Sequence, residues 1–201
     1  IPNVGYQSHL FSPNSIKIMV DIDQEEMDKP TIKIDYPINE DLHKFMSKLL
    51  VTLTLADTKS DVTPLPNFYS WIKKTQEWKK KYPVYQKEYA DITKGINSYH
   101  FMEVLSKHLT DNHIVVTDMG TSYTCTMQAL KMNGKNRLFT SSACCSMGFG
   151  LPGAIGAYFA DPTKEIILIA GDGGFQMNIQ ELQTVVHYKI PIKIFILNNK
   201  G

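Results

Sequence analysis

Apolar and polar positions follow helix and strand periods in turn along residues 98–201. Four short apolar runs are typical of strands buried in a parallel sheet: residues 113–117, 137–140, 165–170 and 192–197. Between and before them, the spacing predicts four helices: about Ser98–His108, Ser122–Lys131, Gly148–Phe159 and Met177–His187. The last helix is expected to bury Ile179, Leu182, Val185 and Val186. This order predicts a doubly wound α/β domain that binds ligands at the carboxyl ends of its strands.

Residues 1–97 are patterned differently. An apolar run covers residues 16–22, Asp23 is expected to cap a helical turn through Met27, and residues 31–34 alternate like an edge strand. Asn39 is expected to cap a helix with one apolar face: Leu42, Phe45, Met46, Leu49 and Leu50. These elements are too few to close a core, so residues 1–55 are interpreted as the C-terminal part of an α/β middle domain. Residues 56–97 then form a linker with a helix near Phe68–Lys81, and residues 98–201 the ligand-binding domain.

Composition excludes several classes of partner. The chain has 201 residues, and its 21 basic and 20 acidic side chains leave a formal charge of +1, which favours neither nucleic acid nor a membrane surface. No apolar run reaches the roughly 20 residues of a membrane-spanning helix. Cys125, Cys144 and Cys145 lack metal-ligand spacing and are expected to be small buried thiols, which suits a reducing cytoplasm. Because Ile1 is not a methionine and Gly201 closely follows a strand, we expect a fragment of a longer polypeptide, truncated at its C-terminus.

Oxygen ligands follow two of the predicted strands. Asp172 comes just after residues 165–170, and Asn199 just after residues 192–197. Parallel strands connected by a helix end at the same edge of a sheet, about 4.8 Å apart if adjacent and twice that with one strand between. Either spacing allows a carboxylate and an amide oxygen to share one ion, and a pair without cysteine or histidine favours Mg²⁺. The sequence therefore predicts a magnesium site formed by Asp172 and Asn199.

Glycine-rich turns beside this site suit a phosphate. Gly173 and Gly174 allow close approach of the backbone, and the N–H groups of the following helix are expected to point to the same place. Residues 120–122, Gly-Thr-Ser, form a second such turn with two hydroxyls at a helix start. Magnesium bound by few protein groups completes its octahedron with water and substrate phosphates. A diphosphate with its metal would fit between the two turns.

The motif Gly171-Asp172-Gly173, then 24 residues, then Asn198-Asn199, resembles the thiamine-diphosphate signature of enzymes related to acetolactate synthase and pyruvate decarboxylase. The strings GDGGFQMNIQELQT and SMGFGLPGAIGA resemble the acetolactate synthase branch. The similarity covers residues 98–201 and, more weakly, residues 1–55, where VDID resembles the end of the family's middle domain.

The resemblance implies a set of site residues. Magnesium would be bound by Asp172, by the Asn199 side chain and by the backbone carbonyl of Gly201. Cys145 would offer its backbone carbonyl to the aminopyrimidine of thiamine diphosphate, and Met147 would wedge beneath the cofactor and keep it bent. The residues implied to contact the cofactor are Gly120, Thr121, Ser122, Cys145, Met147, Gly171, Asp172, Gly173, Gly174 and Asn199.

The family's reaction is decarboxylation of a 2-oxo acid such as pyruvate, with transfer of the two-carbon unit to a second oxo acid. The resemblance implies that the activating glutamate lies on a separate amino-terminal domain of a neighbouring subunit. We therefore expect no catalytic side chain in this segment, a homodimer or homotetramer, and no activity from the segment alone. Binding of flavin (FAD) is left open, because the middle domain is mostly missing. The acceptor is also open, because residues beyond Gly201 are absent.

Three alternatives remain open. Gly120-Thr121-Ser122 resembles the pyruvate decarboxylase branch, since acetolactate synthases often have Gln-His-Gln after that glycine, and this favours a simple 2-oxo acid decarboxylase of the same fold. Residues 148–153 also satisfy GxGxxG, with Asp172 falling 19 residues after Gly153, which would suit a nicotinamide-dependent oxidoreductase. That alternative leaves Asn198-Asn199 unexplained. A noncatalytic relative retained for assembly would instead have no need of the metal ligands.

Overall fold

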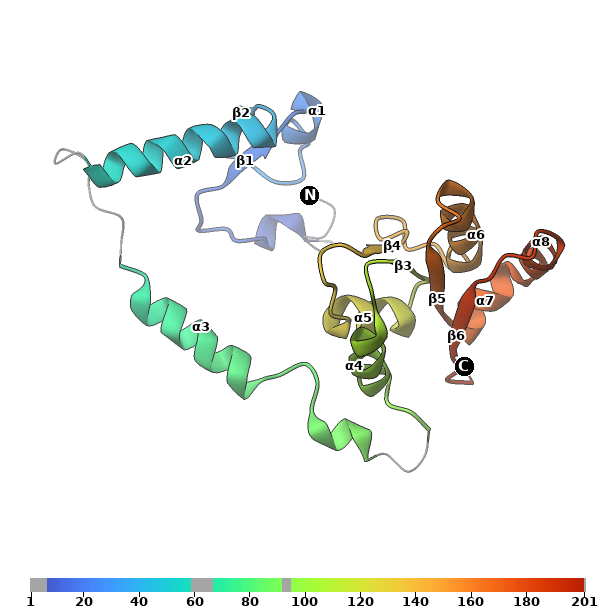
Figure 1. Ribbon diagram of the computed structural model, residues 1–201. Helices are drawn as coiled ribbons and strands as arrows, with labels where there is room; N and C mark the ends of the chain where they lie inside the picture. Colours follow the sequence, from blue (N-terminus) through green and yellow to red (C-terminus); the bar gives the residue numbers. More distant parts are fainter. Residues whose placement is uncertain (1–6, 59–66, 92–94, 201) are drawn as a thin grey trace. The chain divides into compact units, whose positions relative to one another are not determined.

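The computed structural model describes residues 7–58, 67–91 and 95–200. The chain divides into two compact units, residues 1–74 and residues 75–201 (Figure 1). The first unit contains η1 (Ser8–Leu10), β1 (Ile18–Asp21), α1 (Gln24–Met27), β2 (Tyr36–Asn39) and α2 (Leu42–Thr58). Helix α3 (Tyr69–Lys81) crosses the boundary between the units. Asp23 caps α1 as predicted, because its side chain accepts the Glu25 N–H.

Two expectations for the first unit are wrong. The second strand is β2, paired in parallel with β1 from Ile18 opposite Tyr36, and not residues 31–34. Just before the first register pair, the Asp35 carboxylate accepts the Lys17 N–H and the Asp35 N–H donates to the Lys17 carbonyl oxygen. Asn39 does not cap α2, because its amide donates to the carbonyl oxygens of residues 21 and 22. Asp41 caps this helix instead, through a 3.1 Å hydrogen bond from the Lys44 N–H.

The second unit contains a four-stranded parallel sheet in the order β4-β3-β5-β6. Its strands are β3 (His113–Thr117), β4 (Arg137–Phe139), β5 (Glu165–Gly171) and β6 (Lys193–Leu197). Its helical elements are η2 (Lys87–Ala90), α4 (Ser98–His108), α5 (Thr121–Ala129), α6 (Gly150–Ala160), α7 (Asp172–Met177), η3 (Ile179–Glu181) and α8 (Leu182–His187). All four predicted strands are present, within a residue or two at each end.

Helices cover both faces of this sheet. On one face, Met102 of α4 packs in a buried cluster with Val115 and Ile169 of the strands. On the other face, Leu151 of α6 packs with the buried side chain of Leu168. Successive strand residues point to opposite faces, so β3 is apolar at residues 114–116 and β5 at residues 166–170. The predicted doubly wound α/β fold is therefore confirmed.

The helix expected at residues 177–187 is wrong in its bounds. The chain becomes helical at Asp172, directly after β5, and the helix is interrupted at Asn178 before η3 and α8. Asn178 uses its side-chain amide to donate to the Gly148 carbonyl oxygen at 2.8 Å, which ties the interruption to another loop. Ile179 and Val186, expected to be buried, are 48% and 69% exposed. None of the described helices is both long and apolar enough to cross a membrane.

Candidate functional site

The predicted metal ligands follow two strands that are direct neighbours. β5 pairs in parallel with β6, and the last pair in register is Gly171 with Leu197. Asp172 directly follows Gly171 and begins α7, and Asn199 is the second residue after Leu197. No strand lies between them, so the closer of the two expected spacings applies, about 4.8 Å between the strands.

The two asparagines after β6 differ in their surroundings. Asn198 accepts the Lys200 N–H through its side-chain oxygen at 2.9 Å, which closes a short turn in which Lys200 has a positive φ of 63°. Asn199 is exposed, and Asp172 is half-buried at the start of α7. The local turn therefore engages the side-chain oxygen of Asn198, and the ligand role of Asn199 stays a prediction.

A cavity of about 580 Å³ lies beside these loops. Thr121, Asn198 and Asn199 line it together, so the structure brings the glycine turn at residues 120–122 to the end of β6. The remaining lining residues come from β6, α4 and the segment before α4: Gly95, Ile96, Ser98, Phe101, Phe195, Ile196 and Leu197. Asp172 is not among them, and it approaches this group only through the pairing of β5 with β6.

The turn before α5 has the backbone that the phosphate prediction requires. Gly120 is exposed at the helix N-cap with φ of 81°, a conformation that favours glycine. No side chain caps α5, so the N–H groups of its first turn have no side-chain partner. Thr121 is exposed, whereas Ser122 is fully buried and its hydroxyl donates to the Met119 carbonyl oxygen at 2.9 Å. A ligand at this turn would meet the Thr121 hydroxyl, but only the backbone of Ser122.

Asp118 is a central residue of the site that the sequence reasoning did not identify. Its carboxylate is fully buried and accepts the N–H groups of Met119 at 2.7 Å, Gly148 at 3.1 Å and Gly150 at 3.3 Å. A Cβ atom on Gly174 would lie 3.1 Å from this carboxylate. One side chain thus links the turn after β3, the turn before α6 and the start of α7. The place of Asp118 between an apolar strand and a glycine turn could have marked it as a candidate site residue. Its hydrogen-bond partners before α6, however, lie about thirty residues further along the chain.

The turn before α6 is fixed against α7 as well. Gly148 has φ of 83°, and a Cβ atom there would lie 2.7 Å from the Met177 Cβ. Met147 is 53% exposed, and its methyl carbon lies 3.9 Å from where a Cβ on Gly173 would be. The structure therefore places the predicted wedge residue beside one of the predicted phosphate glycines.

Cys145, whose carbonyl is predicted to bind the aminopyrimidine, adopts a positive φ of 50° in this turn. Its N–H donates to the Ser141 carbonyl oxygen at 2.8 Å. The expectation of three buried thiols is wrong for Cys144 and Cys145, which are both exposed, and right for Cys125. Their place in an irregular surface turn, and not on a helix face, explains the difference.

The donor set fits a hard divalent ion that retains other ligands. Asp172 and Asn199 supply oxygen atoms, and within residues 7–58, 67–91 and 95–200 no three histidine, cysteine or acidic side chains are grouped for a metal. An ion bound here would need phosphate or water oxygens to complete an octahedron. Gly201, the third predicted ligand, lies outside the described residues.

The geometry argues against a dinucleotide at residues 148–153. In that fingerprint, a strand leads directly into the glycine turn, whose backbone approaches a pyrophosphate. Here β4 ends at Phe139, nine residues before Gly148. The N–H groups of Gly148 and Gly150 both donate to the buried carboxylate of Asp118, which occupies the place of an anion.

Comparison with known proteins gives consistent similarities. Residues 118–201 match the family described as "Thiamine pyrophosphate enzyme, C-terminal TPP binding domain". The chain is 35% identical over 186 residues to the acetolactate synthase large subunit of Lactococcus lactis subsp. lactis, covering 92% of this chain and 30% of that protein. It is 30% identical to the acetolactate synthase isozyme 1 large subunit of Escherichia coli, with 95% and 32% covered. It is 33% identical to a probable acetolactate synthase large subunit of Methanocaldococcus jannaschii, with 94% and 31% covered. The chain thus spans about 30% of the length of these relatives.

Proposed function

We propose that the chain binds thiamine diphosphate with Mg²⁺ where β3, β5 and β6 end, on the premise that residues 118–201 match the thiamine pyrophosphate enzyme family by its C-terminal TPP-binding domain. The observation that carries the proposal is the direct pairing of β5 with β6, which ends with Gly171 opposite Leu197. Asp172 and Asn199 then follow neighbouring strand ends, which supports the proposal that they share one ion.

The proposal gives each part of the site a separate role. Asp172, the Asn199 amide oxygen and the Gly201 carbonyl would bind Mg²⁺. The Thr121 hydroxyl and the N–H groups at the start of α5 would bind the diphosphate, supported by the cavity shared with Asn199. The backbone segments proposed to approach the diphosphate are those of Gly120, Ser122, Gly171, Gly173 and Gly174. Met147 would support the bent cofactor from below, and the Cys145 carbonyl would orient the aminopyrimidine.

For the whole protein we propose decarboxylation of a 2-oxo acid, pyruvate in the first instance, with carboligation to a second oxo acid. Bound thiamine diphosphate would supply the electron sink for decarboxylation. The relatives at 30–35% identity are acetolactate synthase large subunits, which supports the carboligase branch. The turn Gly120-Thr121-Ser122 favours the second candidate, a simple 2-oxo acid decarboxylase. An assay that measures both acetolactate and free aldehyde formed from pyruvate distinguishes the two candidates. The carboligase should form acetolactate, and the simple decarboxylase should release free aldehyde.

The remaining features of the whole protein are proposals of the same kind. Residues 1–55 would belong to a middle domain, residues 56–97 to a linker and residues 98–201 to the cofactor domain. An activating glutamate from a neighbouring subunit would require a homodimer or homotetramer, and this segment alone would be inactive. We propose the cytoplasm as the compartment of the whole protein. A purified full-length protein that is active and monomeric at assay concentration would contradict this arrangement.

Titration calorimetry of the purified full-length protein tests the central proposal. Thiamine diphosphate should bind in the presence of Mg²⁺ and not in the presence of a chelator. Asp172→Asn keeps the shape of the side chain but removes a charged metal ligand, so we expect binding to weaken by at least about tenfold. Asp91→Asn is the matched control, since Asp91 is an exposed carboxylate after η2 and lies outside the lining of the cavity beside β6.

Three results would count against the proposal. Equal binding of thiamine diphosphate with and without Mg²⁺ would show that the site does not use the metal. Binding of NAD without any effect of Mg²⁺ would favour the oxidoreductase. If neither ligand binds the folded protein, the segment is a noncatalytic relative retained for assembly.

A further inference from the structure

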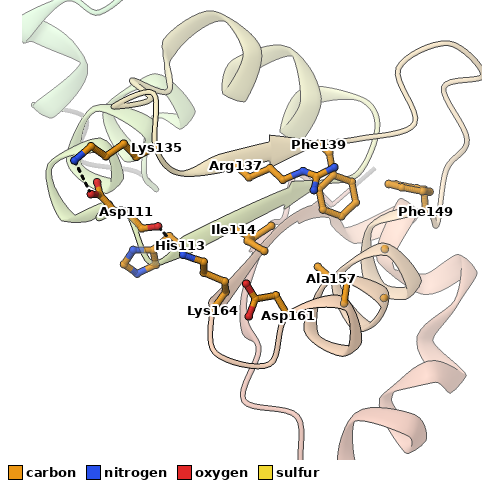
Figure 2. A pocket seen from close by; sticks show the side chains of 13 residues that line it. Asp111, His113, Ile114, Lys135, Arg137, Phe139, Phe149, Ala157, Asp161 and Lys164 are labelled. Atoms are coloured by element: carbon orange, nitrogen blue, oxygen red, sulfur yellow. Dashed lines mark hydrogen bonds and ion pairs between the residues drawn. The ribbon is translucent and has the colours of Figure 1, made fainter.

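A second cavity of about 600 Å³ lies at the other end of the sheet (Figure 2). Its lining includes His113 and Arg137, the first residues of β3 and β4, together with the last turn of α6. The proposed cofactor site is built from residues that follow the last residues of β3, β5 and β6. Because these strands are parallel, the two cavities lie at opposite edges of the sheet, and the second one takes no part in the proposed thiamine diphosphate site.

Arg137 is the distinctive residue of this second cavity. It is the only arginine in a chain with 21 basic residues, so lysine supplies every other positive side chain. Its guanidinium carbon lies 5.8 Å from the centroid of the Phe139 ring. In the part of the chain that the structure describes, it forms no ion pair. A planar guanidinium held against an aromatic ring, with its N–H groups unpaired by carboxylates, is suited to a phosphate or carboxylate.

The wall next to Arg137 is apolar and partly aromatic. The rings of Phe139 and Phe149 meet edge to face, with centroids 6.2 Å apart and an interplanar angle of 82°. Figure 2 shows the Phe139 ring beside the Arg137 guanidinium, with Phe149 further along the same side. Gly156 has no atom near the position of a Cβ and is exposed. The Phe149 ring itself packs on α6, since a Cβ on Gly153 would lie 3.0 Å from it. A flat ring would instead lie beside Phe139 and over the open backbone at Gly156.

The opposite wall has charges of both signs. Lys164 donates to the backbone carbonyl oxygen of Asp111 at 3.2 Å, which leaves two of its three ammonium donors for a ligand. Lys135 is already paired with the Asp111 carboxylate at 3.3 Å. Asp161 accepts the N–H and the hydroxyl of Thr163 through the same oxygen, and hydrogen bonding from that hydroxyl holds its pKa below the usual range. Asp161 is therefore an ionised acceptor at the rim near neutral pH.

From this arrangement we propose that the cavity binds a nucleoside monophosphate. The phosphate would lie on Arg137 and Lys164, and the base would pack against Phe139 and Phe149. The ribose hydroxyls would donate to Asp161, as carboxylates accept ribose hydroxyls in other nucleotide sites. A simple aromatic carboxylate would use the arginine and the rings but leave the acidic rim without a partner. The nucleotide is the ligand class that uses all three features of the lining.

Titration of the purified full-length protein with AMP at low ionic strength tests the proposal. Adenosine lacks the phosphate and inorganic phosphate lacks the base, so each is expected to bind at least about tenfold more weakly than AMP. AMP binding should persist when thiamine diphosphate and Mg²⁺ are present at saturation, because the two sites lie at opposite edges of the sheet. Loss of AMP binding under that competition would place the nucleotide in the cofactor site and overturn the proposal.

Arg137→Lys keeps the charge but removes the planar fork, so AMP binding should weaken by at least about tenfold. Lys107→Ala is the control, since it removes a positive charge from an exposed position on α4, outside the cavity lining. Unchanged thermal unfolding of both variants would show that they are folded. AMP binding by Arg137→Lys equal to that of the unmodified protein, or no AMP binding by the unmodified protein, would refute the nucleotide site. Thiamine diphosphate binding is measured separately, so the two proposals can fail independently.

Discussion

The substitution Asp118→Asn is expected to destabilise the fold strongly although it changes one atom of the side chain. The Asp118 carboxylate is fully buried and surrounded by hydrogen-bond donors, namely the N–H groups of Met119, Gly148 and Gly150. An asparagine retains one acceptor oxygen and replaces the other with an NH₂ group. That group would face backbone N–H donors, with which it cannot form a hydrogen bond.

The magnitude follows from counting the donors left unsatisfied. The Gly150 N–H, which bonds the second carboxylate oxygen at 3.3 Å, would lose its partner, and the new NH₂ group would have none. A buried polar group without a partner costs about 1–3 kcal/mol, so two such groups cost about 2–6 kcal/mol. Even at the lower bound, the melting temperature should fall by at least about 4 °C for a chain of this size.

Thermal and urea unfolding monitored by circular dichroism measure the effect. Asp41→Asn is the matched control, because Asp41 caps α2 and asparagine caps a helix equally well. We expect the control to remain within about 0.5 kcal/mol of the unmodified protein. If Asp118→Asn also remained within that range, the carboxylate would not hold the turns before α5 and α6 together, and the account of the site would be wrong.

Three further predictions concern other parts of the second unit. Gly148→Ala should reduce stability by more than about 2 kcal/mol in urea unfolding, because φ is 83° and the added carbon would lie 2.7 Å from the Met177 Cβ; an unchanged midpoint would contradict this. Hydrogen bonding from Lys131 lowers the pKa of Glu103, so its stabilisation is present above the unfolded pKa and is lost as the pH falls through the folded value. Glu103→Gln should therefore narrow the difference in melting temperature between neutral and acid pH, and an unchanged difference would refute this. Burial raises the pKa of the Cys125 thiol, so iodoacetamide should alkylate it last of the three thiols, as mass spectrometry can measure; labelling of Cys125 first would refute this.

Several features of this protein are determined by local sequence. Buried parallel strands contain continuous apolar runs, so β3 and β5 could be located from the pattern of apolar residues along the sequence. The glycine at residue 120 marks a backbone conformation that other residues rarely adopt. The acid and amide after β5 and β6 are visible in the same way, because ligand-binding side chains of a parallel sheet follow its strand ends.

Other features depend on contacts between distant segments. The segment that pairs with β1 begins at Tyr36, next to an Asp35 that bonds Lys17 eighteen residues earlier, and no local alternation reveals this partner. The helix after β5 is interrupted where Asn178 bonds a carbonyl thirty residues earlier. The inward orientation of Ser122 and the burial of Asp118 likewise depend on which turns meet at the sheet edge.

The sequence by itself therefore determined the fold class and the chemical types of the site residues, because both follow from patterns a few residues long. Only the tertiary structure decided that β5 and β6 are adjacent, which residue joins the three loops, and that a second cavity forms around Arg137 at the opposite edge. The physical reason is that strand order, and the meeting of loops separated by thirty residues or more, depend on how the whole sheet packs. No short stretch of sequence contains that information.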